Sequence, residues 1–326
     1  TVSCDDIFMV SRRVSLRAML NLLVSPTILG GNAPEVLLQE FMEVQDRIED
    51  ATANAAVLPR ALGLPLYLWP TQRCRERLQE RLSKRMDDRE DADKAVGPWL
   101  KAFRDANLQP VEAAELTVGL QFAAHKNLSI GAAQAFCYLF SEASPAQLKQ
   151  ARQEARQLVR SFEKGKSGDN SRSTILHSCV LETLRLSAHC IGGLRAVQKE
   201  FRLQSDSGRS YRVKKGELLA ISHLAPNVDK HVFGKDATAF RLSRWNDGDT
   251  KLNLTSFSGG LHKCPGERIA YDCMKVLLAA WLEMGLEPAV APLPRVCFER
   301  ATLAQRKEPV PASSKYGAKI KVRRGR

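Results

Sequence analysis

The sequence predicts a mainly α-helical protein with small antiparallel β-sheets. Over the first 190 residues, apolar side chains recur three and four positions apart, and Gly and Pro mark the breaks between such stretches. Further along, short alternating runs lie between glycines, which is typical of small antiparallel strands. Hydrophobic residues make up 44% and charged residues 26% of the 326 positions, so the chain can bury a large core, and disordered or collagen-like structure is excluded.

Charge and cysteine content narrow the class of protein. The chain carries 49 Lys and Arg against 36 Asp and Glu, a formal net charge of +13. Because basic and acidic residues alternate in most helical stretches, we expect no nucleic-acid partner. The eight cysteines lack paired spacing, which disfavours a disulfide framework or a zinc ribbon and favours a reducing compartment. The longest uncharged stretch, Ala18 to Pro34, is broken by Pro and Gly, so we expect no transmembrane helix, and no signal peptide is visible.

Proline and glycine residues divide the first half of the chain into helices. Pro34 opens a helix that we expect from Glu35 to about Asn54. The segment from Val57 to Pro70 is expected to be an apolar loop. From Gln72 to Lys94 the charge is dense, with arginines spaced by four, which indicates a solvated helical face.

A long helix is expected from Pro110 to about Ala143. Its middle, residues 116–124, is apolar nearly all round, so we expect it to be buried on most sides as a central core helix. Ser144, followed by Pro145 and Gln147, has the pattern of a capping box that starts the next helix. The polar run from Gly165 to Ser173 ends that helix.

After a helix around Leu181, the pattern changes to short strands. We expect these strands at Arg195 to Leu203, Ser210 to Val213 and Glu217 to Ser222. The basic tail from Lys315 to Arg326 is interpreted as a last strand with charged edges.

Three motif-like features are rejected. Gly165, Lys166 and Ser167 imitate the end of a phosphate-binding loop, but Arg160 stands where the motif needs another Gly. His262 and Cys264 have no second His/Cys pair at zinc spacing. We expect His125, on the long helix, to be a core or cavity-lining histidine instead of a metal ligand or an acid-base group.

The most informative segment is the glycine-rich run from Phe257 to Gly266, which precedes a helical pattern extending to Ala280. Cys264 lies at the expected start of that helix. Helix amides and the helix dipole favour a thiolate there by lowering the thiol pKa, and glycines let the backbone approach a flat macrocycle. A thiolate so placed is a good iron ligand. The alternative is an inert buried thiol in an ordinary turn.

This run resembles the heme-binding signature of the cytochrome P-450 family, Phe-x-x-Gly-x-x-x-Cys-x-Gly. It matches at four positions, which are Phe257, Gly260, Cys264 and Gly266. Upstream, Glu182 and Arg185 are similar to the family's Glu-x-x-Arg helix, and their spacing puts both side chains on one helix face. Phe240 to Trp245 is similar to a third family segment, whose Arg, here Arg244, joins that pair in a buried network. The alternative for the pair is an exposed surface ion pair.

The resemblance implies a heme-thiolate fold with iron protoporphyrin IX as cofactor and Cys264 as the axial iron ligand. It assigns His262 and Arg195 to the heme propionates, although Arg195 could also be a solvated charge that enters a strand. The similarity starts near residue 5, whereas family members begin well before it. We therefore expect residues 1–326 to form a single heme-thiolate domain, a cytochrome P-450 fold lacking its N-terminal part, with the membrane anchor in the part that is missing.

One stretch departs from the family pattern. Oxygen-activating members have Ala/Gly-Gly-x-Asp/Glu-Thr on the central helix, whereas this chain has Ala123-Ala124-His125-Lys126-Asn127. Asn127, the candidate catalytic residue there, can hydrogen-bond to bound oxygen but cannot relay a proton as a hydroxyl does. An Asn at this position is similar to the branch that contains sterol hydroxylases and prostacyclin synthase. The resemblance further implies a substrate pocket lined by Phe122, Ala123, Ser187, Ile191 and Leu303.

The resemblance implies a monooxygenase that inserts one atom of dioxygen into an apolar, sterol- or lipid-like substrate. Electrons would come from an NADPH-dependent reductase, and the enzyme would be associated with the endoplasmic reticulum membrane with its domain facing the cytosol. Two alternatives stay open. Lys126 and Asn127 favour an isomerase of lipid peroxides that needs no external electrons, and the missing N-terminal part favours a catalytically inactive heme-binding remnant.

Overall fold

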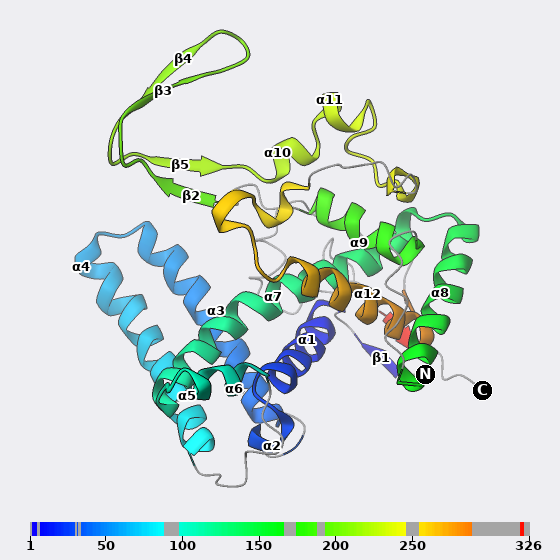
Figure 1. Cartoon of the computed structure of the whole chain (residues 1–326), viewed down its shortest axis with the longest axis horizontal. Coiled ribbons are helices and arrows are strands. Elements are labelled where there is room, and N and C mark those ends of the chain that lie inside the picture. Colours follow the sequence, from blue (N-terminus) through cyan, green and yellow to red (C-terminus); the bar gives the residue numbers. More distant parts are fainter. Residues whose placement is uncertain are drawn as a thin grey trace. The chain divides into compact units, whose positions relative to one another are not determined.

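Helices dominate the structure, and short antiparallel strands accompany them (Figure 1). The computed structural model describes residues 2–4, 7–29, 31, 34–87, 98–165, 174–187, 193–245, 254–288 and 320–322. The chain divides into two units, residues 6–130 and residues 131–326 together with 1–5. One long helix, α7 (Pro110–Glu142), contributes to both of them.

The unit of residues 6–130 is built from helices only, within the part of the chain that is described. They are α1 (Ile7–Leu23), α2 (Pro26–Leu29), α3 (Glu35–Ala56), α4 (Arg60–Gly63), the π-helical turn η1 (Leu64–Leu68), α5 (Trp69–Asp87), α6 (Pro98–Asp105) and the first part of α7. Leu16, Leu20, Leu38 and Leu82 lie at the centre of one apolar cluster and are fully buried. Burial of this apolar surface is the main stabilising term for the unit.

The segment between α3 and α5 differs from the prediction. An apolar loop from Val57 to Pro70 is wrong, because this segment forms α4, η1 and the start of α5. Gly63 lets the segment pass close to α3, since a Cβ there would lie 3.2 Å from the carbonyl oxygen of Ala55. The run is apolar at almost every position, so it has no helical period to detect.

Polar contacts tie three helices of this unit together. Arg12 on α1 donates to Asp46 on α3 at 2.6 Å, and Ser11 Oγ donates to the carbonyl oxygen of Ser129 on α7 at 2.7 Å. Lys126 on α7 pairs with Glu49 on α3, and only 8% of the lysine side chain is exposed. The ammonium group of Lys126 is therefore compensated by a carboxylate where solvent reaches it poorly.

The middle of α7 is less buried than predicted. Leu116, Phe122 and Ala123 are exposed, whereas Ala132 to Leu139 are buried almost continuously. The buried positions of the first part recur three and four residues apart, at residues 113, 114, 117, 118 and 121. The expectation of burial on most sides is therefore wrong for this part, because neighbouring helices cover one face of it.

The second unit packs three long helices around the end of α7. They are α8 (Pro145–Glu163), α9 (Ile175–Leu186) and α12 (Glu267–Glu283). The short helices α10 (Leu224–Asn227) and α11 (Lys230–Phe233) follow, with the 3₁₀ turns η3 (Leu242–Trp245), η4 (Thr255–Phe257) and η5 (Gly260–His262). Phe136 of α7 meets Trp281 of α12 edge to face, with 6.0 Å between ring centroids, and both side chains are buried.

Side-chain caps fix where two of these helices begin. Ser144 Oγ accepts from the amide of Gln147 at 3.3 Å, and the Gln147 side chain accepts from the amide of Ser144 at 3.0 Å, so the predicted capping box is confirmed. At the start of α9, the Glu154 carboxylate accepts from the amides of Ile175 and Leu176, each at 3.1 Å. A carboxylate at a helix N-terminus also complements the helix dipole.

The described strands form three small antiparallel sheets. β2 (Gly193–Ala196) pairs with β5 (Leu218–Ile221), and β3 (Phe201–Gln204) pairs with β4 (Ser210–Val213). β7 (Ile320–Val322) lies between β1 (Val2–Cys4) and β6 (Leu286–Pro288).

Two strand predictions meet different outcomes. The single strand from Arg195 to Leu203 is wrong, because Val197 exchanges backbone hydrogen bonds with Gly216 and Glu217 and the chain then passes into the second hairpin. A strand in the basic tail is confirmed, but it is the central strand of its sheet, so the expectation of a charged edge is wrong.

The Ser144 cap gives a test of local stability. We expect Ser144→Ala to lower the free energy of unfolding by about 1 kcal/mol, because the amide of Gln147 loses its acceptor at the helix start. Urea unfolding of the full chain measures this change. Ser161→Ala is the matched control, since Ser161 lies in the last turn of the same helix, its hydroxyl donates to the Leu158 carbonyl oxygen instead of capping an amide, and Ala is a better helix former than Ser. Equal losses in the two variants would contradict the capping role.

Candidate functional site

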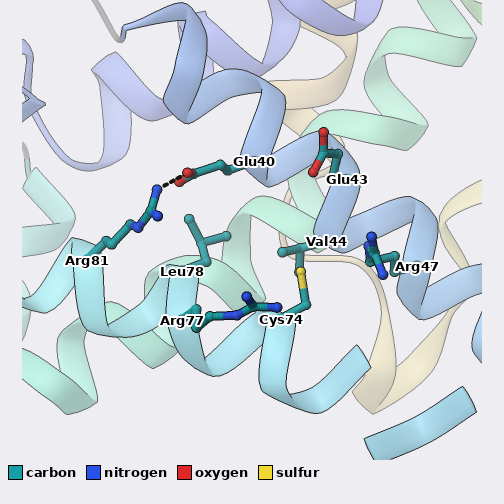
Figure 2. Close-up of a pocket in the computed structure, with 8 residues that line it drawn as sticks. All are labelled: Glu40, Glu43, Val44, Arg47, Cys74, Arg77, Leu78 and Arg81. Carbon is teal, nitrogen blue, oxygen red and sulfur yellow. Dashed lines mark hydrogen bonds and ion pairs between the residues drawn. The ribbon is translucent and has the colours of Figure 1, made fainter. Parts of the chain in front are cut away.

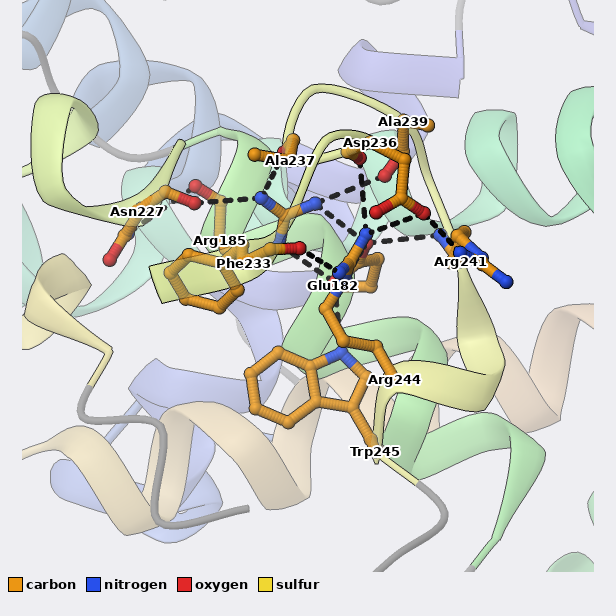
Figure 3. A network of polar contacts seen from close by, with 10 residues as sticks. All are labelled: Glu182, Arg185, Asn227, Phe233, Asp236, Ala237, Ala239, Arg241, Arg244 and Trp245. Atoms are coloured by element: carbon orange, nitrogen blue, oxygen red, sulfur yellow. Dashed lines mark hydrogen bonds and ion pairs between the residues drawn. The ribbon is translucent and has the colours of Figure 1, made fainter. Parts of the chain in front are cut away.

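A buried acid and base pair lies on α9. Glu182 and Arg185 are both 0% exposed, and the Arg185 guanidinium donates to the two carboxylate oxygens at 2.7 and 2.8 Å (Figure 3). The i, i+3 spacing puts both side chains on the same helix face, as the sequence predicts. The alternative of an exposed surface pair is wrong.

Three more donors converge on the Glu182 carboxylate. They are the backbone amide of Arg241 at 3.0 Å, Nε of Arg244 at 3.2 Å and Nε1 of Trp245 at 2.9 Å. The structure thus brings Arg244 to Glu182 and Arg185, as the family pattern implies. A carboxylate without solvent needs such donors, because an unpaired buried charge costs several kcal/mol.

Arg185 also fixes the backbone that follows β5. Its guanidinium donates to the carbonyl oxygens of Asn227 at 2.7 Å and Ala239 at 3.0 Å, and to that of Ala237. The ring of Phe233 lies 4.8 Å from the guanidinium carbon, within the range of a cation–π contact. Arg185 therefore organises the irregular chain between β5 and η3.

The loop that carries Cys264 is closed by its own backbone. The Cys264 amide donates to the carbonyl oxygen of Phe257 at 2.9 Å, and the Lys263 amide donates to that of Gly260 at 3.1 Å. Ser258 and Gly260 both have positive φ angles, +63° and +66°. A left-handed conformation is unfavourable at a serine, so the contacts on either side of Ser258 must hold this turn.

The far side of the loop is held by α12. The ring of Phe257 packs edge to face on Tyr271, with 5.1 Å between centroids. Lys263 pairs with Glu267 at 2.6 Å, and the Tyr271 hydroxyl lies 3.4 Å from the same Glu267 side chain. Glu267 is the first residue of α12, so Cys264 lies two residues before the Gly266 cap and not inside the helix.

The residues around Cys264 fit a flat iron macrocycle. The thiol is exposed, and a Cβ built on Gly259 or Gly260 meets no atom within 4 Å. Leu261 is 95% exposed. One loop thus presents a thiol, backbone that no side chain covers and an exposed apolar side chain. These groups suit an apolar ring whose metal ion prefers a thiolate ligand.

The two predicted propionate ligands belong to the same unit. His262 is exposed, two residues from Cys264. Arg195 on β2 is half-buried, and its guanidinium donates to the carbonyl oxygen of Leu194 at 3.0 Å. Neither side chain is tied into the network of Glu182 by a contact that the described structure contains, and their role toward heme stays a prediction.

The remaining predicted residues that the structure describes lie on α7 and at the end of α9. Phe122, Ala123 and Asn127 lie on α7 and are exposed. Ser187 caps the C-terminus of α9, is buried, and its hydroxyl has no hydrogen-bond partner among the described residues. Ile191 and Leu303 lie outside the described residues.

His125 is buried, as expected of a core histidine. Its Nδ1 lies 2.7 Å from the carbonyl oxygen of Gln121, so Nδ1 carries the proton, and Nε2 has no partner within the described part of the chain. Burial lowers the pKa of His125 to about 4, and the charges of Arg12 and Lys126 act in the same direction. The imidazole is therefore neutral at pH 7.

A groove between α3 and α5 is lined by none of the predicted site residues (Figure 2). Its volume is about 250 Å³, below the roughly 300–1,000 Å³ of ligand pockets. It is lined by Glu40, Glu43, Val44, Arg47, Cys74, Arg77, Leu78 and Arg81. Arg81 pairs with Glu40 across it. We interpret the groove as part of the solvated, charged face that the sequence predicts for α5.

The sequence gives little sign of two residues that the site uses. Asn227 follows a proline and has the pattern of an ordinary turn residue. Tyr271 falls in the helical pattern of α12 and resembles any core aromatic. The sequence indicates a role for Asn227 only by its position between the Glu-x-x-Arg helix and the cysteine loop. Finding its partners, however, requires the fold.

Known proteins match the chain on sequence. A family model described as Cytochrome P450 matches residues 71–288. A sterol 14-demethylase of Arabidopsis thaliana is 24% identical over 307 residues, which cover 88% of this chain and 61% of that protein. A 25-hydroxycholesterol 7-alpha-hydroxylase of Rattus norvegicus is 34% identical over 116 residues, which cover 32% and 27%. The chain thus spans about 61% of the length of the plant relative.

Solved structures match the fold. A crystal structure of a cytochrome P450 aligns with a TM-score of 0.63 at 18% identity, over 88% of this chain and 67% of that one. The crystal structure of CalO2 aligns with a TM-score of 0.61 at 16% identity, over 98% and 68%. The helical architecture with small antiparallel sheets is therefore that of these structures.

The low pKa of His125 predicts a pH dependence of stability. An unfolded histidine titrates near 6.5, so between pH 6.5 and about 4 the unfolded chain binds the proton that the folded chain excludes. We expect the free energy of unfolding to fall by about 2 kcal/mol from pH 7 to pH 5 on this account. Urea unfolding at the two pH values measures it.

His125→Asn should remove this part of the pH dependence, because the amide nitrogen can replace Nδ1 and does not titrate. His231→Asn, at an exposed position, is the matched control and should leave the dependence intact. An unchanged pH dependence in the His125 variant would contradict the assignment.

Proposed function

The chain belongs to the cytochrome P450 family, and on that premise we propose that it is a heme-thiolate monooxygenase. Its reaction would insert one atom of dioxygen into an apolar, sterol- or lipid-like substrate. The observation that carries the proposal is the exposed Cys264 thiol on a loop that is closed by its own backbone and backed by buried polar contacts. Bound heme supplies oxygen-activating chemistry, which a thiolate ligand favours by pushing electron density toward the iron.

Each predicted site residue has a distinct part in this proposal. Cys264 would ligate the iron, and Gly260 and Gly266 would leave room for the macrocycle beside it. His262 and Arg195 would bind the propionates by charge-assisted hydrogen bonds. Glu182 with its partners would keep the loop in place from the protein side.

The long helix α7 offers both apolar and polar groups to a substrate. Phe122 and Ala123 are exposed apolar side chains, and Asn127 is exposed one turn after Ala123. Since Lys126 is held by Glu49, the amide of Asn127 is the polar group that would orient a bound molecule or water.

The names of the relatives support the sterol-like substrate. The matched proteins include the sterol 14-demethylase, the 25-hydroxycholesterol 7-alpha-hydroxylase and an obtusifoliol 14-alpha demethylase of Sorghum bicolor. An NADPH-dependent reductase would supply the electrons. An isomerase of lipid peroxides is the second candidate function, favoured by the absence of an acid at position 126 of the central helix.

Exposed apolar side chains on the segment of sequence from the end of α3 to the start of α5 support membrane association. Val57, Leu62, Leu66 and Trp69 are all exposed, and Arg60 lies among them. Exposed apolar side chains with adjacent basic residues suit the interface of an anionic bilayer. None of the described helices is long and apolar enough to cross a membrane. The proposed location is the cytosolic face of the endoplasmic reticulum.

A carbon monoxide difference spectrum tests the heme assignment. We expect the reduced full chain, produced with heme available, to give a strongly red-shifted Soret band, because a thiolate ligates the iron. Cys264→Ala should abolish the band. Cys273→Ala is the matched control and should retain it, because Cys273 is a half-buried cysteine on α12.

The reaction type is decided on the same preparation. Sterol oxidation that requires NADPH and a reductase, and that is absent in Cys264→Ala, is the expected result. Turnover of a lipid hydroperoxide without reductant would favour the isomerase instead. A red-shifted band that survives in Cys264→Ala would overturn the assignment of the ligand.

The membrane surface is tested by vesicle flotation. We expect the double variant Leu62→Ser with Leu66→Ser to bind vesicles of phosphatidylcholine and phosphatidylserine at least about tenfold more weakly, because each buried leucine contributes about 1.5–3 kcal/mol. Leu203→Ser with Leu218→Ser removes two equally exposed leucines from the strands and is the control. Equal binding by both double variants would rule out this surface.

A further inference from the structure

A buried amide connects α9 with the cysteine loop. Asn227, the last residue of α10, is 1% exposed. Its Oδ1 accepts from the amide of Thr255 at 3.1 Å and lies 3.0 Å from the Thr255 hydroxyl oxygen. Its Nδ2 donates to Ser256 Oγ at 3.0 Å and to the carbonyl oxygen of Arg185 at 3.3 Å. Both donors of the amide are therefore used, and its oxygen accepts from a backbone amide.

On one side, Asn227 and Arg185 each donate a side-chain hydrogen bond to the backbone of the other. The Arg185 guanidinium donates to the backbone oxygen of Asn227 at 2.7 Å, while the Asn227 side chain donates to the backbone oxygen of Arg185 (Figure 3). Because Arg185 is itself fixed by Glu182, the position of Asn227 is set by the buried ion pair.

On the other side, Asn227 holds the turn that begins the cysteine loop. Thr255 and Ser256 are the first two residues of η4, and each has a second anchor. The Thr255 hydroxyl donates to the carbonyl oxygen of His223 at 2.6 Å, and Ser256 Oγ donates to that of Leu184 at 2.8 Å. The last residue of η4 is Phe257, whose carbonyl oxygen receives the amide of Cys264.

We infer that Asn227 is a positioning residue that transmits the placement of Arg185 to the loop presenting Cys264. The inference rests on the proposed function only for the role of Cys264 as iron ligand, since the link itself is made of hydrogen bonds of the chain. An asparagine suits this position because it has two donors and an acceptor on one short fork. An aspartate lacks the donors that Arg185 and Ser256 receive.

Hydrogen exchange of the heme-free full chain tests the link. We expect Asn227→Ala to speed exchange of the Thr255 and Cys264 amides about tenfold relative to amides in α8, because η4 loses the contacts that hold it. Leu158→Ala is the control, since it removes a buried side chain of α8 and touches no hydrogen bond of the loop. It should destabilise the unit without that preference. If the Cys264 amide responds no more to Asn227→Ala than to Leu158→Ala, the link is overturned.

A second variant and a second readout separate positioning from folding. Thr255→Val keeps the backbone and removes only the hydroxyl contacts, so it should also speed exchange of the Cys264 amide. It serves as the test variant if Asn227→Ala folds poorly. In heme-loaded protein, both variants should lower the fraction of the thiolate-ligated carbon monoxide complex at equal heme content, whereas Leu158→Ala should not. An unchanged fraction despite faster exchange would overturn the transmission to Cys264. If the unsubstituted chain binds no heme, the proposed function fails, and the exchange measurement still decides the link.

Discussion

One buried carboxylate, that of Glu182, constrains the unit of residues 131–326. It is removed from solvent and accepts five hydrogen bonds, two of them from Arg185 and the others from residues 241, 244 and 245. A charge in that environment is tolerated only with all its donors in place. The chain between β5 and η3 has little regular structure, and the need to deliver those donors determines its path.

The same constraint explains how an exposed loop keeps a defined shape. Cys264 must stay accessible if it is to ligate a cofactor, so burial cannot fix it. Its loop also contains Ser258 in a left-handed conformation, which a free loop would leave. Rigidity therefore has to come from groups behind the loop. Asn227 and Tyr271 supply it at the two ends, one through hydrogen bonds and the other through ring packing.

How well the sequence predicts an interaction depends on how far apart its two residues are along the chain. The Glu182 and Arg185 contact and the Ser144 cap depend on residues three positions apart, so spacing alone indicates them. Resemblance to a family predicts the place of Arg244, because no local pattern relates it to a carboxylate 62 residues upstream. Asn227 was missed because its side-chain partners lie 28 to 42 residues away along the chain, where no periodicity operates.

Two errors of prediction share another cause. The run from Val57 to Pro70 and the middle of α7 are apolar at most positions, and both predictions rest on that content. Apolar content does not say whether a neighbour will cover the surface. In the structure, helices cover one face of α7, and Leu62 and Leu66 remain exposed. The sequence alone therefore could not separate these exposed apolar residues from core residues.

The stretch from Ala123 to Asn127 shows how a departure from a family pattern is accommodated. A lysine in place of an acid would be costly where solvent is scarce, but Glu49 on α3 supplies the missing negative charge. The pair neutralises itself, so position 126 has no free carboxylate with which to move protons. Cleaving dioxygen consumes protons, whereas rearranging a peroxide does not. Under the proposed function, the side chain at position 126 therefore offers no proton donor of the family type, and the exposed amide of Asn127 is the neighbouring polar group.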